Sequence, residues 1–170
     1  MISDIYFFNA CGLANELRDG TVSEARAVKH LIAAIIIGGL TFGVPVTVEC
    51  KGAETGFGET AGFLVLTIIT AFISYYGIWM TYQANRKGDG KDYFLRFSVL
   101  TLPVGLQLVV LFALVSLLLF VPLSVLIAES GWLGQYTVEA LFYSSYIVFT
   151  VMFYLRMRKF ISVASGAGSD

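Results

Sequence analysis

The sequence predicts an all-α polytopic membrane protein with four transmembrane helices in two hairpins, preceded by an amphipathic N-terminal helix. Of its 170 residues, 57% are hydrophobic and 14% are charged, against about 45–50% and about 25% in soluble domains. The hydrophobic residues gather into runs that approach the roughly 20 residues of helix needed to cross a bilayer. Short polar segments separate these runs, so a soluble fold with a single core is excluded.

Residues 1–20 carry a loose helical stripe of apolar residues among polar ones, with Gly20 placed to end a helix. The segment is too short and too polar to cross a membrane. We therefore predict an amphipathic interfacial helix that lies on the membrane or packs against the bundle. Binding to a partner protein is the functional alternative.

The transmembrane domain is predicted at residues 21–160, with its first span at about 29–48. Thr21 and Glu24 have the spacing of a capping box, which predicts the start of a helix. Gly39 and Gly43 form a small-residue face that lets another helix approach closely. Packing within the chain is the favoured interpretation of this face, and dimerisation is the alternative.

The second span is predicted at about 63–83, after an acidic loop that contains several glycines. Helical spacing puts Tyr75, Trp79 and Tyr82 on one face. Aromatic residues of this kind are typical of a membrane interface. An aromatic-lined cavity is the alternative interpretation.

A charged segment at 85–96 separates the two hairpins. Gly88 and Gly90 give the backbone freedom that a turn needs, and the surrounding Lys, Arg and Asp residues predict a solvated loop. A calcium-binding loop is excluded, because Lys87 stands at a ligand position and Arg96 replaces the bidentate acid.

The third span is predicted at about 97–120. The apolar run that begins there would measure roughly 48 Å as one straight helix, so it should bend or end near Pro122. Gln107 is the only amide in this run, and we expect it to face protein or water instead of lipid.

The fourth span is predicted at about 136–155. It contains Glu139, the one acidic residue that could lie inside the bilayer, where carboxylates are candidates for functional sites. Hydration among the lipid headgroups is the other interpretation of Glu139, because it closely follows the preceding loop. The chain then ends in small residues from Ser165 to Asp170, and we expect a flexible tail at 161–170.

The positive charges predict the orientation. Of the eleven Lys and Arg residues, only Lys51 falls on the far side of this topology. Since cytoplasmic segments carry the excess of Lys and Arg, both termini and the central loop are expected in the cytoplasm. The ten residues on the cytoplasmic side are Arg18, Arg26, Lys29, Arg86, Lys87, Lys91, Arg96, Arg156, Arg158 and Lys159.

The polar residues carry no enzyme signature. His30 is the only histidine and suits a membrane interface better than a catalytic pair. Cys11 and Cys50 are expected on opposite sides of the membrane, so we expect no disulfide between them. No Cys and His spacing typical of a metal site occurs, and we expect no metal, cofactor or nucleic-acid partner.

Two segments resemble those of small, uncharacterised four-helix bacterial inner-membrane proteins. They are the stretch from Leu17 to Glu24 and the segment 85–96 with Leu100 and Pro103 after it. This resemblance covers most of the chain. It implies a location in a bacterial inner membrane and no established activity.

The leading hypothesis is a non-enzymatic membrane protein that acts by association, as a homo-oligomer or as an accessory subunit of a membrane complex. The alternative is a small oligomeric channel or transporter that favours cations, because acidic loops would surround its outer mouth. The residues expected to line such a path, or to pack as polar groups, are Gln107, Glu139, Tyr143, Ser144 and Tyr146.

Overall fold

A computed structural model describes residues 5–42, 57–120, 122–123 and 132–167. Every regular element in these ranges is a helix, which confirms the all-α class. The elements are α1 (Ala10–Arg18), α2 (Glu24–Phe42), α3 (Phe57–Lys87), α4 (Tyr93–Val115), the π-helical turn η1 (Ser116–Phe120) and α6 (Trp132–Ala164).

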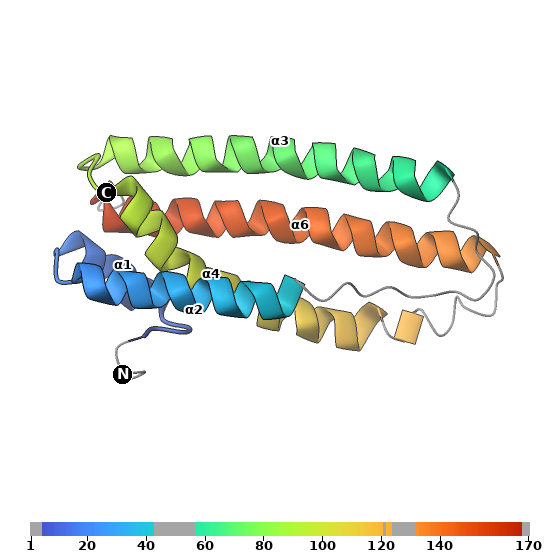
Figure 1. The fold of residues 1–170 in the computed structure, drawn as a ribbon, viewed down its shortest axis with the longest axis horizontal. Helices are drawn as coiled ribbons and strands as arrows, with labels where there is room; N and C mark the ends of the chain where they lie inside the picture. Colours follow the sequence, from blue (N-terminus) through green and yellow to red (C-terminus); the bar gives the residue numbers. More distant parts are fainter. Residues whose placement is uncertain (1–4, 43–56, 121, 124–131, 168–170) are drawn as a thin grey trace.

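Helix α6 lies at the centre of the bundle. It packs against α3, α4 and α1, while α2 packs against α4 (Figure 1). Helices α2 and α4 run in one direction along the long axis, and α3 and α6 run in the other (Figure 1). The end of α6, the α3–α4 turn and α1 therefore meet at the same end of the bundle.

Two helices are long and apolar enough to cross a membrane. They are Leu64–Lys87, with a mean hydropathy of 1.6, and Tyr93–Leu119, with a mean hydropathy of 2.5. Only 11% and 22% of their most apolar windows are buried, whereas the core helix of a soluble protein would bury most of such a surface. Among the described residues, these two helices have the length and hydropathy of a membrane span. An arrangement with four spans is therefore a proposal.

Helix α1 presents its apolar face to protein. Ala10, Leu13 and Ala14 are fully buried and Leu17 is nearly so, a spacing that places all four on one side of the helix. They pack on α4 and α6. Asn9 caps the start of the helix, and its side chain accepts a hydrogen bond from Gly12 N at 2.9 Å. Of the two predicted locations for this amphipathic segment, packing against the bundle is the one observed.

The start of α2 differs from the predicted capping box. Ser23 accepts a hydrogen bond from Arg26 N at 3.4 Å, while the Thr21 hydroxyl donates to the Glu16 carbonyl at 3.1 Å. Thr21 therefore helps to close the end of α1, where Gly20 adopts the left-handed conformation with φ of 69°. Thr21, which was predicted to cap the start of α2, therefore forms its hydrogen bond with the end of α1 instead.

The end of α6 also differs from the prediction. The helix continues beyond the predicted span to Ala164 because Met157, Ile161 and Ala164 are fully buried on one of its faces. Their burial contradicts a flexible tail beginning at residue 161. The helix is followed by a turn at 165–167, and residues 168–170 lie outside the described ranges.

Candidate functional site

An ion pair between a buried arginine and an exposed aspartate organises the turn between α3 and α4. Arg96 donates from Nη1 to Asp89 Oδ1 at 2.5 Å and from Nη2 to Asp89 Oδ2 at 2.7 Å. Arg96 is only 4% exposed, and Nη1 also donates to Asn85 Oδ1 at 2.9 Å. The arginine side chain, chiefly through its hydrogen bonds, lowers the pKa of Asp89 to about 2. The prediction of a solvated loop therefore fails at Asn85 and Arg96, which are buried because they pair with each other and with Asp89.

The same turn is attached to the end of α6. Asp89 N donates to the Ser165 carbonyl at 2.9 Å, and Ser165 Oγ donates to the Ala84 carbonyl at 3.4 Å. A Cβ atom on Gly88 would lie 2.1 Å from the Ser165 carbonyl oxygen, so only glycine permits this approach. Gly90 completes the turn with φ of 68°. Both glycines lie at a turn, as the sequence predicts. The contact between this turn and the end of α6 was not predicted.

A second polar cluster holds the N-terminal segment on α2. His30 is fully buried; its Nε2 accepts from Tyr6 N at 3.0 Å, and Nδ1 lies 2.9 Å from the Arg26 carbonyl. This pair of contacts requires the neutral ring that carries its proton on Nδ1. Glu16 accepts from the Tyr6 hydroxyl at 2.8 Å and from Arg26 Nη1 at 2.6 Å. His30 is therefore a buried structural residue at this end of the bundle.

Gln107 connects three separate parts of the chain. Its Nε2 donates to the Phe8 carbonyl, and its Oε1 accepts from Arg156 Nη1 at 2.9 Å. Gln107 on α4 thus faces protein, one of the two environments expected for it. No local sequence pattern indicates that Arg156 and the backbone of Phe8 are its partners, because the three segments are far apart in the chain.

The other predicted path residues all belong to α6. Ser144 is exposed, and its hydroxyl donates to the Ala140 carbonyl of its own helix at 2.7 Å. Tyr143 is half-buried and Tyr146 is 42% exposed. The backbone of Glu139 lies in α6, whereas its side chain falls outside what the structure describes. The hydrogen bonds of Gln107 go to Phe8 and Arg156. They do not connect it to Tyr143, Ser144 and Tyr146 in one polar path.

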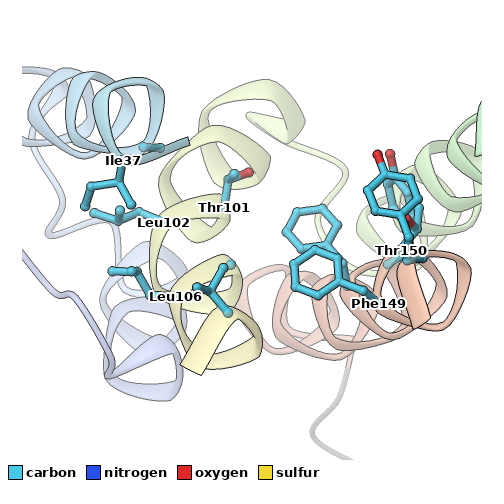
Figure 2. Close-up of a pocket in the computed structure, with 12 residues that line it drawn as sticks. Ile37, Thr101, Leu102, Leu106, Phe149 and Thr150 are labelled. Carbon is cyan, nitrogen blue, oxygen red and sulfur yellow. The ribbon is translucent and has the colours of Figure 1, made fainter. Parts of the chain in front are cut away.

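An apolar cavity of about 280 Å³ lies between α2, α4 and α6. Ile37, Leu102 and Leu106 line it on one side, and Phe149 and Thr150 line it from α6 (Figure 2). The Thr101 and Thr150 hydroxyls donate to backbone carbonyls of their own helices, so they offer the cavity mainly their methyl groups. Such a cavity suits a hydrocarbon group and not an ion. Its remaining residues are Ala34, Gly105, Val109, Tyr146, Phe153 and Tyr154.

A second hollow, an aromatic groove of about 650 Å³, lies on the outer face of α3 and α4. Tyr82 is its centre: its ring lies 5.8 Å from that of Trp79 and 5.5 Å from that of Tyr93, centroid to centroid. The predicted aromatic face of α3 therefore forms one wall, and α4 adds the other. The groove is lined by Tyr75, Ile78, Trp79, Tyr82, Asp92, Tyr93, Phe94 and Leu95.

The described residues hold no group of three or more His, Cys, Asp or Glu side chains that could bind a metal ion. Cys11 is exposed on α1, and Cys50 lies outside the described ranges. Gly39 lies in α2, while Gly43 is also outside those ranges. No protein-family model, curated protein or solved structure matches this chain. The function must therefore be argued from geometry.

Proposed function

We propose that the chain crosses a membrane four times, through α2, α3, α4 with η1, and α6. Each of these helices carries large apolar side chains that are more than a third exposed. On α2 they are Val28, Leu31, Ile32, Ile35 and Ile36, whose spacing makes one continuous stripe. A stripe of this kind is stable against lipid and unfavourable in water.

The distribution of charge supports cytoplasmic termini. The elements that carry all Lys and Arg residues except Lys51 meet at one end of the bundle (Figure 1). An excess of Lys and Arg beside the spans marks the cytoplasmic side. The resemblance to bacterial inner-membrane proteins supports that membrane as the location.

Thiol labelling tests this topology. In a Cys11→Ser, Cys50→Ser background, Lys91→Cys should react with an impermeant reagent only after the membrane is opened, because Lys91 is in the exposed α3–α4 turn. In a Cys11→Ser chain, Cys50 should react from outside without that treatment. Labelling of both positions from one side would contradict the four-span arrangement.

We further propose that the protein acts by association and not by catalysis, as a homo-oligomer joined through the outer face of α2. The observation that carries this proposal is the division of α2 into two faces. Ala27 and His30 are buried toward the protein, whereas the stripe from Val28 to Ile36 is exposed. Gly39 follows Ile35 by one helical turn, a spacing that puts the two residues on the same side of α2.

A glycine at the end of an exposed apolar stripe favours a partner helix from outside the chain. Small residues let two helix backbones approach closely in a membrane. A second copy is the partner that fits best, since twofold dimers bring the same patch of both subunits together. This reverses the preference for packing within the chain that the sequence favoured for Gly39.

Oligomeric state in mild detergent and in liposomes tests the association. Gly39→Leu should reduce the dimer fraction, because the larger side chain separates the two helices. Val65→Leu is the matched control: Val65 is 55% exposed on α3, and added bulk there should leave the dimer intact. A monomeric wild-type protein, or a Gly39→Leu variant that dimerises as well as wild type, would refute this role. A different co-purifying membrane subunit would replace the second copy as the partner.

A further inference from the structure

We propose that the aromatic groove of α3 and α4 binds a phosphatidylethanolamine molecule, with its ammonium group held at Asp92. The groove combines several aromatic rings with one carboxylate at its edge. Aromatic faces attract cations through their quadrupole, and a carboxylate supplies the opposite charge. This proposal concerns a different surface from the α2 face and does not depend on oligomerisation.

The rings of the groove are available to a ligand. Tyr75 is 70% exposed, Trp79 is 50% exposed and Phe94 is 83% exposed. Tyr93 is held in place at the floor: its hydroxyl lies 2.8 Å from Thr81 Oγ1 and donates to the Ile78 carbonyl at 3.2 Å. Its edge-to-face contact with Tyr82 fixes the orientation of both rings. The walls are therefore organised before any ligand arrives.

Asp92 has an unusual backbone for its position. It is the only non-glycine residue with positive φ in the described ranges, at 48°, and it precedes the first residue of α4. Asp at this position commonly caps the helix that follows, yet the Asp92 side chain makes no capping hydrogen bond. Asp92 is exposed and is one of the residues that line the groove. Aspartate is one of the few non-glycine residues that adopt the left-handed conformation readily.

The length and position of the groove favour a lipid over a soluble amine. At about 1.5 Å per residue, Tyr82 lies roughly 7 Å and Tyr75 roughly 18 Å along α3 from its end at Lys87. The headgroup layer on each side of a bilayer is about 5–8 Å thick. With the end of α3 at the membrane surface, as in the topology proposed above, Asp92 and Tyr82 lie at headgroup level, and Tyr75 and Ile78 lie beside the acyl chains.

The charge of the groove selects the headgroup. Asp92 is the one charged residue in the lining of the groove, and it is exposed. An ethanolamine ammonium can donate hydrogen bonds to a carboxylate and also lie over an aromatic ring. A choline group has no N–H to donate, and a glycerol headgroup has no positive charge.

Lipid binding to the full chain tests the proposal. Dioleoyl phosphatidylethanolamine, phosphatidylcholine or phosphatidylglycerol would be titrated into the detergent-solubilised protein, with bound lipid counted by native mass spectrometry. We expect phosphatidylethanolamine to bind most tightly. Asp92→Asn should weaken it about threefold and Trp79→Leu about fivefold. Asparagine tolerates the left-handed backbone, so Asp92→Asn removes the charge and keeps the fold.

Two matched controls separate the groove from general effects. Asp19→Asn removes an exposed carboxylate elsewhere, and Phe72→Leu removes an aromatic ring from α3 that is 72% exposed but outside the groove. Both should bind phosphatidylethanolamine as wild type does. Equal affinity for the three lipids, or equal losses in the controls and in the groove variants, would overturn the proposal.

Discussion

Arg156 on α6 donates a hydrogen bond of 2.9 Å to Gln107 on α4, across 49 residues of sequence. The same amide group donates to the Phe8 carbonyl, so one side chain connects the N-terminal segment to two long helices. If the amide were lost, Arg156 would lose this acceptor, and the Phe8 carbonyl would keep only its hydrogen bond from Ala10 N at 3.1 Å.

Gln107→Leu should therefore lower the free energy of unfolding by about 1–3 kcal/mol, since it leaves the Arg156 guanidinium and the Phe8 carbonyl without this partner. Thermal unfolding in detergent would measure the loss. Gln83→Leu, which changes a half-buried glutamine on α3, is the control and should have a smaller effect. Equal losses in both variants would mean that the three-way contact contributes nothing specific.

The ion pair of Asp89 predicts a dependence of stability on pH. Because the folded protein lowers the pKa of Asp89 from 3.8 to about 2, the pair stabilises the fold fully above about pH 4. That contribution is lost as the pH falls from 4 towards 2, where the carboxyl group becomes protonated in the folded state too. Asp89→Asn should remove this component of the acid destabilisation.

The measurement is the difference in unfolding free energy between wild type and Asp89→Asn as a function of pH. It should be constant above about pH 4 and shrink below it. Asp19→Asn, which breaks an exposed pair with Arg18 at 3.3 Å, should change stability by less than about 1 kcal/mol at neutral pH. A wild-type and Asp89→Asn difference that does not change between pH 5 and 2 would contradict the assignment.

Two glycines make a matched pair for testing helix packing. A Cβ atom on Gly77 of α3 would lie 2.2 Å from the Tyr154 ring of α6, whereas one on Gly105 of α4 would meet nothing within 4 Å. Gly77→Ala should therefore destabilise the protein by about 1–3 kcal/mol through overpacking. Gly105→Ala should be neutral, or stabilising by up to about 1 kcal/mol through helix propensity. The reverse order of melting temperatures would show that α3 and α6 do not pack at Gly77.

His30 should control the docking of the N-terminal segment. His30→Leu removes the acceptor of the Tyr6 amide, so the backbone around Tyr6 should exchange its amide hydrogens faster and be cleaved sooner by protease. Hydrogen exchange followed by mass spectrometry would measure this for the peptide that contains Tyr6. Lys29→Leu, a change at the neighbouring residue, is the control, and protection that is unchanged in His30→Leu would contradict the role.

Composition and periodicity predicted the features that depend only on whether each segment faces water or apolar surroundings. The all-α class, the stop at Gly20 and the amphipathic face of α1 all follow from patterns within a few residues. The errors arose where a distant partner decides the environment. Arg96 ends the charged segment 85–96 in sequence, yet Asp89 and Asn85 make its burial favourable.

The end of α6 shows the same limit. Small polar residues follow Ile161, which is typical of a disordered tail, but Ser165 is held by the α3–α4 turn. Likewise, nothing near Gln107 in sequence indicates Arg156 as its partner. Only one wall of the groove was predicted. The aromatic face of α3 follows from helical spacing, whereas Tyr93 and Asp92 lie beside it because the α3–α4 turn brings the start of α4 back against α3.

The position of α1 has a consequence for biosynthesis. Its buried face rests on α4 and α6, which leave the ribosome long after α1 does. At about 5–20 residues per second, the wait is on the order of 10 s. During that time the four apolar side chains of α1 have no partner within the chain, so the nascent N-terminus would need the lipid surface or a chaperone. We expect mutations that delay the packing of α6 onto α1 to expose α1 to proteases first.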